Sequence, residues 1–209
     1  MFPAVSPATL LLATLALSAL SGCSTPHQVA STAPTTASSD VAGHTDTQYG
    51  FRIAIPPGVT PRPDFATSYL ANEDWKAYAG PDSHGVPRLA MALPGSNRIT
   101  TAELRIGVSG EAREVRRCTQ PPQGVAGKPE TVTINGVDYT RFNAQDAAMS
   151  HYLVVEAYRA VHAGRCYALD LMVYGVNPQV YSPPATAPFS QAQALRQLRT
   201  WLGGFAFLP

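Results

Sequence analysis

Hydrophobic positions alternate with polar or small ones along much of the chain beyond residue 48, which is typical of half-buried β-strands. The first such stretch is 49–55, YGFRIAI, and the Pro-Pro-Gly that follows predicts its end. Further apolar or alternating stretches predict strands at 75–79, 89–93 and 102–108. The pattern therefore favours a domain built mainly from β-strands.

Two hairpins are predicted in the second half of the chain. Asn135 and Gly136 separate the runs 131–134 and 137–142, and this dipeptide suits a two-residue turn with positive φ angles. Ala163 and Gly164 separate the longer runs 152–162 and 165–174, which are rich in Val, Leu and Tyr. A turn at Ala163 and Gly164 places Asp170 opposite Ala157 and Glu156 opposite Leu171.

Helical patterns occur at two places. Ser190 can cap a C-terminal helix that Gly203 and Gly204 can end. Its apolar stripe is Ala194, Leu195, Leu198, Trp201 and Leu202, with Arg196 and Arg199 toward solvent. A shorter helix is expected at 111–117 with Ser109 as its cap, and a last strand at 205–208. The prediction is a single α+β domain, residues 47–209, in which helices flank an antiparallel sheet.

The N-terminal segment has a different character. Residues 8–20 form an apolar run of thirteen residues, which suits the core of a signal peptide and is too short to span a bilayer. The sequence Leu20, Ser21, Gly22, Cys23 directly follows it and resembles the lipobox of bacterial lipoprotein precursors. The resemblance implies a signal peptide at 1–22 and acyl chains on Cys23 that hold the protein to a membrane. Cleavage at an ordinary small-residue site, which would leave a soluble protein, is the alternative.

The residue after the lipidated cysteine indicates to which membrane the protein is sorted. The resemblance implies sorting to the outer membrane, because Ser24 replaces the Asp that usually retains enterobacterial lipoproteins at the inner membrane.

Residues 24–46 are mostly Ser, Thr, Ala and Pro, without an aromatic residue. Such a composition cannot bury enough apolar surface to fold, so residues 23–46 are predicted to form a disordered tether, and His27 and His44 to be solvated within it.

The balance of charges bears on nucleic acid as a partner, and the cysteines predict a disulfide. The chain has 15 basic and 14 acidic residues, a net charge of +1, so nothing in the balance favours nucleic acid as a partner. With Cys23 acylated, Cys118 and Cys166 remain in an oxidising compartment and are predicted to form a disulfide. In the chain-entropy model this bridge stabilises the fold by roughly 4 kcal/mol. A redox-active pair is the alternative, but a separation of 48 positions favours a structural bridge.

Residues that could carry out chemistry are few. Ser109 follows a predicted strand, but Glu111 stands where a nucleophile elbow has Gly. His151 and His162 fall on opposite faces of one strand and cannot share a metal, and His84 lies in a loop. No phosphate-binding loop, zinc spacing or dinucleotide fingerprint is present, so no catalytic residue, metal or cofactor is predicted.

A tyrosine-rich face of the long hairpin is the candidate binding surface. It contains Tyr152, Glu156, Tyr158 and Tyr167, and aromatic rings with polar tips could line a groove. The competing interpretation is ordinary sheet packing, with Asp170 paired to Arg159 on the other side.

Two end segments resemble the PsbP and DcrB-like group of small domains. These are 50–58, GFRIAIPPG, and 198–207, LRTWLGGFAF. The resemblance implies an antiparallel sheet flanked by helices that serves as a binding or assembly module in the cell envelope. We therefore expect a lipid-anchored, non-enzymatic protein that binds another envelope component. An envelope hydrolase and a carrier of a small ligand are the alternatives.

Overall fold

The computed structural model describes residues 42–122, 125 and 127–209. The predicted signal peptide, Cys23 and residues 23–41 of the predicted tether lie outside these residues. The elements, in chain order, are β1 (Gly43–Asp46), β2 (Phe51–Ala54), β3 (Val86–Ala92), β4 (Thr100–Ser109), α1 (Ala112–Arg117), β5 (Glu130–Ile134), β6 (Val137–Ala148), β7 (His151–His162), β8 (Arg165–Val176), the 3-10 turn η1 (Pro178–Val180), α2 (Gln191–Leu202) and β9 (Phe205–Phe207).

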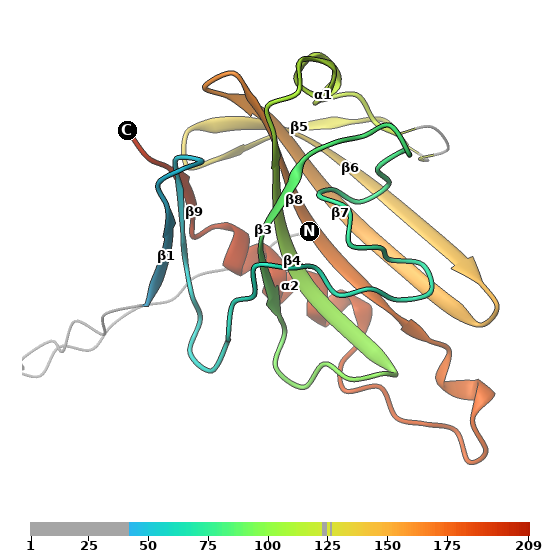
Figure 1. Ribbon diagram of the computed structural model, residues 1–209. Coiled ribbons are helices and arrows are strands. Elements are labelled where there is room, and N and C mark those ends of the chain that lie inside the picture. The colour runs from blue at the N-terminus through green and yellow to red at the C-terminus, as the bar shows by residue number, and fades with distance from the viewer. Residues whose placement is uncertain (1–41, 123–124, 126) are drawn as a thin grey trace, which may run out of the picture. The chain divides into compact units, whose positions relative to one another are not determined.

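The strands form two antiparallel sheets. One has six strands in the order β3-β4-β8-β7-β6-β5, and the other has three strands in the order β1-β2-β9 (Figure 1). Strands dominate the described part of the chain and helices are sparse, so the predicted α+β class holds only in outline. Strands β4, β8 and β7 are neighbours inside the larger sheet and carry most of its buried side chains.

Both predicted hairpins are present with the predicted turns. Asn135 and Gly136 join β5 to β6 with φ angles of 49° and 79°. Ala163 and Gly164 join β7 to β8 with φ angles of 46° and 73°. In that hairpin Ala157 lies opposite Asp170, and Glu156 opposite Leu171, as the turn position requires. Register follows from the turn because a two-residue loop leaves only one pairing between the strands.

Helix α2 covers one face of the six-stranded sheet (Figure 1). It begins with a capping box, in which the Ser190 hydroxyl accepts the amide N–H of Gln193 and the Gln193 side chain accepts the N–H of Ser190. The buried side of the helix consists of Ala194, Leu198, Trp201 and Leu202. Each fully buried Leu stabilises the fold by about 1.5–3 kcal/mol, so this face holds α2 on the sheet.

The opposite face is covered by the long segment 55–85, which crosses in front of the sheet in Figure 1. Gly107 of β4 permits the close approach, because a Cβ there would lie 1.7 Å from the Trp75 carbonyl oxygen. The strand expected at 75–79 is wrong, since these residues belong to this irregular segment. Their apolar side chains pack on the sheet without joining its hydrogen-bond ladder, and alternation alone does not separate the two cases.

Three other expectations need correction. The tether does not extend to residue 46, because Gly43–Asp46 forms β1 on the edge of β2, and the imidazole of His44 lies 6.0 Å from the Phe51 ring. Ser109 is not the cap of α1; Glu111 holds that position, without a side-chain cap bond, and its N–H donates to the Ser109 hydroxyl. Strand β6 continues to Ala148, six residues beyond the predicted end, and turns directly into β7.

Candidate functional site

The tyrosine-rich face is covered by α2 and is not an open groove. Arg199 of the helix forms a two-pronged ion pair with Glu156, with Nε donating to Oε2 over 2.8 Å. Tyr158 and Tyr167 are buried in the core between helix and sheet, while Tyr152 is half-buried and its hydroxyl lies 2.7 Å from that of Thr100. The groove expected at Tyr152, Glu156, Tyr158 and Tyr167 is thus wrong, because the C-terminal helix and, over Tyr167, the Phe207 ring of β9 cover the same face.

Buried charges occupy the other face, beneath segment 55–85. Arg159 donates to Asp170 over 2.7 Å, and both side chains are almost fully buried, so the competing interpretation is the one observed. The second carboxylate oxygen of Asp170 accepts the amide N–H of Ala77 over 2.8 Å. The guanidinium of Arg159 also lies over the Phe142 ring. This pair connects the sheet to the covering segment.

A second buried charge cluster lies on β4 and is not evident from the sequence. Glu103 forms ion pairs with Arg105 and with Arg62. Arg105 also donates to the carbonyl oxygens of Ala66 and Asn72, over 2.6 Å and 2.7 Å. A buried charge is tolerated only when its hydrogen-bonding capacity is largely used, and here the partners come from the covering segment. The cluster holds residues 62–72 in place.

The serine and histidine side chains considered for a hydrolase interact with other groups and not with one another. The Ser109 hydroxyl donates to the carbonyl oxygen of His84 and accepts the N–H of Glu111. His151 Nδ1 lies 2.9 Å from the Met149 carbonyl oxygen, and the His162 ring stacks on Phe207 at 3.9 Å. Within the described residues, no hydrogen bond joins a serine or cysteine side chain to an imidazole, and no group of three metal-ligating side chains is found.

An apolar surface lies where β6 turns into β7, and we call it the hairpin-end surface. It consists of Tyr69, Met149 and His151, and Val180 follows on η1, whose first residue Pro178 lines the adjoining cavity. The exposed fractions of Met149, Tyr69 and Val180 are 79%, 58% and 53%, the highest of the large hydrophobic side chains that the structure describes. Tyr69 stacks on His151 with ring centroids 4.6 Å apart. The surface therefore unites residues from the covering segment, the β6–β7 turn and η1.

A cavity of about 520 Å³ opens at the same place. Its walls come from the β6–β7 turn, the start of η1 and the start of α2: Ala147, Ala148, Met149, Ser150, His151, Tyr152, Asn177, Pro178 and Gln191. The amide N–H of Asn177 donates to the Ser150 carbonyl oxygen over 2.8 Å, which holds η1 beside the turn. The size is within the range of small-molecule and peptide-anchor pockets.

The β6–β7 turn is strained. Met149 and Ser150 have φ angles of 48° and 65°, a region that L-residues other than Asn and Asp rarely adopt. Hairpins of this type elsewhere in the chain use Asn-Gly and Ala-Gly, with Gly at the second position. Strained residues often persist where they serve a function, so the turn adds a second observation to the exposed side chains. Sequence reasoning missed this site because Met149-Ser150 is not a turn signal.

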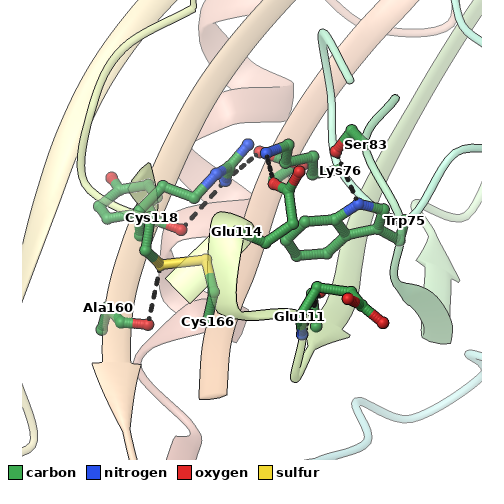
Figure 2. Close-up of a disulfide and its surroundings, with 12 residues drawn as sticks. Trp75, Lys76, Ser83, Glu111, Glu114, Cys118, Ala160 and Cys166 are labelled. Carbon is green, nitrogen blue, oxygen red and sulfur yellow. Dashed lines mark hydrogen bonds and ion pairs between the residues drawn. A yellow bond between two sulfur atoms is a disulfide. The ribbon is translucent and has the colours of Figure 1, made fainter. Parts of the chain in front are cut away.

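The disulfide between Cys118 and Cys166 anchors the other end of the sheet (Figure 2). It agrees with the predicted pairing, and its Cα atoms lie 5.5 Å apart. Both cysteines are buried together with Trp75, whose indole N–H donates to the Ser83 hydroxyl over 3.1 Å. The bridge thus joins the end of α1 to the start of β8, and Trp75 packs the covering segment against it.

A polar pocket of about 620 Å³ lies beside this bridge, between residues 76–83 and α1. We call it the disulfide-side pocket. Its charged and amide-bearing lining residues are Lys76, Asp82, Arg113, Glu114, Arg117 and Gln120. Lys76 and Glu114 form an ion pair across the pocket wall, as Figure 2 shows. Sequence reasoning missed the pocket because its two walls are about thirty residues apart and meet only in the folded chain.

Two tyrosines between the covering segment and the sheet, Tyr78 of the segment and Tyr174 of β8, have perturbed pKa values. Burial raises the pKa of Tyr78 to about 12, with a smaller contribution from the carboxylates of Asp146 and Asp170. Burial also raises the pKa of Tyr174 to about 12, and Glu103 adds to the shift. In both cases the neutral phenol is favoured because the phenolate would lose its hydration.

Comparisons with known proteins give little further information. No family model and no curated protein matches this chain. The chain is similar in structure to cyanobacterial PsbP (CyanoP) from Synechocystis sp. PCC 6803, known from its solution structure, with 13% sequence identity and a TM-score of 0.40. The similarity covers 79% of this chain and 91% of that protein, and amounts to a weak PsbP-like resemblance. Among the described residues, no helix is long and apolar enough to cross a membrane.

Proposed function

We propose that this chain is a cell-envelope lipoprotein whose domain is a non-catalytic module that binds another envelope protein through the hairpin-end surface. The protein is held by acyl chains on Cys23, on the periplasmic face of the outer membrane. The observation that carries the binding proposal is the coincidence of exposed apolar side chains, a cavity and a strained turn at one end of the sheet.

The envelope location is supported by two features of the chain. The apolar run at 8–20 followed by Leu20, Ser21, Gly22 and Cys23 has the arrangement of a lipoprotein signal. The Cys118–Cys166 disulfide fits an oxidising compartment, since such bridges are rare in the cytosol. The location is tested by Cys23→Ser. We expect this variant to leave the membrane fraction, and full membrane retention would contradict the anchor.

Protein binding is favoured over ligand carriage by the shape of the site. The tyrosine-lined cavity that a carrier would need is filled by α2, whereas the hairpin-end cavity is open and adjoins exposed Met149 and Tyr69. Exposed apolar side chains grouped around a pocket are typical of protein interfaces, because aromatic residues and Met contribute strongly to their buried centres.

Site-specific photo-crosslinking in intact cells tests this interface. A photoreactive residue at position 149 should trap one envelope protein, while the same residue at position 161 should not. Val161 is a matched control because it is also an exposed apolar residue, 48% accessible, at the opposite end of β7. Equal trapping from both positions, or none from position 149, would refute the proposed interface.

The PsbP or DcrB-like fold is part of the same proposal. Strand β2 ends at Ala54, two residues before Pro56, and α2 leads into the Phe-containing strand β9, as in the group that the two end segments resemble. Nuclear Overhauser contacts between strands that give a different order from β3-β4-β8-β7-β6-β5 would contradict this assignment.

A further inference from the structure

The disulfide-side pocket contains more positive than negative side chains. Lys76, Arg113 and Arg117 line it, against Asp82 and Glu114. The rest of its wall is neutral and includes the amide of Gln120. A partly enclosed site with this composition has a positive potential that water screens less well than it does on an open surface.

The three cations differ in how far their charge is already neutralised. The Lys76 ammonium is paired with Glu114 and lies 4.7 Å from the centre of the Trp75 ring. Arg113 lies 3.7 Å from Asp82, but both side chains are more than half exposed, at 54% and 76%. Such an exposed pair is weak and easily exchanged.

Arg117 has no acidic partner among the residues that the structure describes. A guanidinium offers a planar pair of N–H donors that matches the two oxygens of a carboxylate or phosphate. Arg117 therefore supplies the free donors that an anion entering the pocket would require, and Arg113 can turn from Asp82 to assist.

The disulfide fixes the geometry of one wall of this site. Cys118 directly follows Arg117 and is tied to β8 through Cys166, with Cα atoms 5.5 Å apart, so the end of α1 is held in place. On the opposite wall, Tyr78 has an unusual φ angle of 59°, and its side chain packs against a buried cluster on β6, β7 and β8. A site whose two walls are both fixed loses little entropy when it binds a ligand.

We propose that the disulfide-side pocket binds an anionic oxygen group, a carboxylate or a phosphate, with Arg117 as its principal donor. The group belongs either to a free small ligand or to a lipid headgroup. This inference is independent of the hairpin-end surface, which lies at the opposite end of β7 and β8.

Amide chemical-shift titration of the full chain tests the site, with sodium phosphate and sodium acetate as separate probes at constant ionic strength. We expect saturable shifts at Lys76, Arg113, Arg117 and Gln120. Arg117→Gln should raise the dissociation constant about tenfold or more, because it removes a charge-assisted bidentate contact. Arg117→Lys should keep only part of the affinity, because an ammonium lacks the fork.

Arg196→Gln is the matched control, since Arg196 is exposed on α2 and does not line the pocket. The affinity of the Arg196→Gln variant for phosphate should equal that of the unchanged chain. Equal losses in Arg117→Gln and Arg196→Gln, or shifts that do not saturate with either probe, would overturn the site. Arg113→Gln provides a second pocket variant if Arg117→Gln fails to give a folded spectrum.

Vesicles distinguish the two sources of the anion. Arg117-dependent binding to phosphatidylglycerol vesicles, and not to phosphatidylcholine vesicles, would assign the group to a lipid headgroup. Binding of the free anions without any Arg117-dependent vesicle binding would assign it to a soluble ligand. Either result supports the pocket, and the absence of both would refute it.

Discussion

Individual buried charges explain why polar residues interrupt the most apolar strands of the chain. Asp170 and Arg159 face each other diagonally on one hairpin, so the pair could be predicted once the turn at Ala163 and Gly164 was located. The amide of Ala77 completes the coordination of Asp170 from a segment ninety-three positions away. That contact could not be predicted, because it depends on how an irregular segment crosses the sheet.

Removal of one member of this pair should be costly. Asp170→Ala should lower the free energy of unfolding by about 3–5 kcal/mol, because Arg159 would remain buried without its counter-ion. Urea denaturation measures the loss. Asp138→Ala is the control, since Asp138 is exposed and its change should cost about 0.5 kcal/mol or less. Similar midpoints for the two variants would contradict a structural role for the buried pair.

The buried phenols predict a loss of stability at high pH. Tyr78 and Tyr174 have folded-state pKa values of about 12, against an ordinary value of 10.0. Below pH 10 the phenols are neutral in both states and their contribution is complete. Between pH 10 and 12 the unfolded chain loses these protons first, so the free energy of unfolding should fall.

Replacement of both residues by Phe should make this decline shallower, because Phe has no proton to lose. Unfolding curves measured across the alkaline range test the effect, and tyrosinate absorbance follows the titration itself. An equally steep decline in the double variant would show that other groups dominate the alkaline transition.

At the scale of elements, regular patterns were predicted well and irregular ones were not. Helix α2 has the predicted cap, stripe and end, because an amphipathic period of twelve residues is a strong signal. Strand β1 was missed since its four residues, Gly-His-Thr-Asp, have no apolar alternation, and Asp46 is held instead by hydrogen bonds from Arg88 and Tyr49. The covering segment resembles a strand locally although the fold uses it as a loop.

The candidate sites could likewise be predicted from the sequence only where a local pattern marks them. The sequence alone predicted the disulfide, because once Cys23 is assigned to the lipid anchor, Cys118 and Cys166 are the two cysteines that remain. Neither the hairpin-end surface nor the disulfide-side pocket has a local motif. Each is assembled from side chains on separate segments, such as Tyr69 with His151 or Lys76 with Arg117, so the sites exist only after folding.

The strained β6–β7 turn makes a prediction at this scale. Replacing Met149-Ser150 by Asn-Gly should raise the free energy of unfolding by about 1 kcal/mol, since Asn and Gly accept positive φ angles readily. Partner capture through the hairpin-end surface should fall because the exposed Met149 side chain is lost. A variant that is destabilised would show that Met149 and Ser150 carry no strain.

At the scale of the whole molecule, the sheet is covered by a regular helix on one side and an irregular segment on the other (Figure 1). The disulfide contributes to the second side by holding α1 against β8. Strands account for far more of this architecture than helices do.

Loss of the disulfide should therefore weaken the entire domain. The double change Cys118→Ser and Cys166→Ser should lower the free energy of unfolding by roughly 4 kcal/mol in the chain-entropy model. Thermal unfolding with and without reductant provides the comparison. Reductant should lower the melting temperature of the unchanged chain and leave that of the double variant as it is; no response in either would mean that the bridge is absent from the isolated protein.

The length of the central hairpin determines how far apart a protein partner and an anion would be bound. Strands β7 and β8 each have twelve residues, which at about 3.3 Å per residue separates their ends by roughly 36 Å. A protein held at one end and an anion held at the other would not touch. The domain is long enough to act as a spacer that holds a protein and an anion at the same time, at a fixed distance from each other.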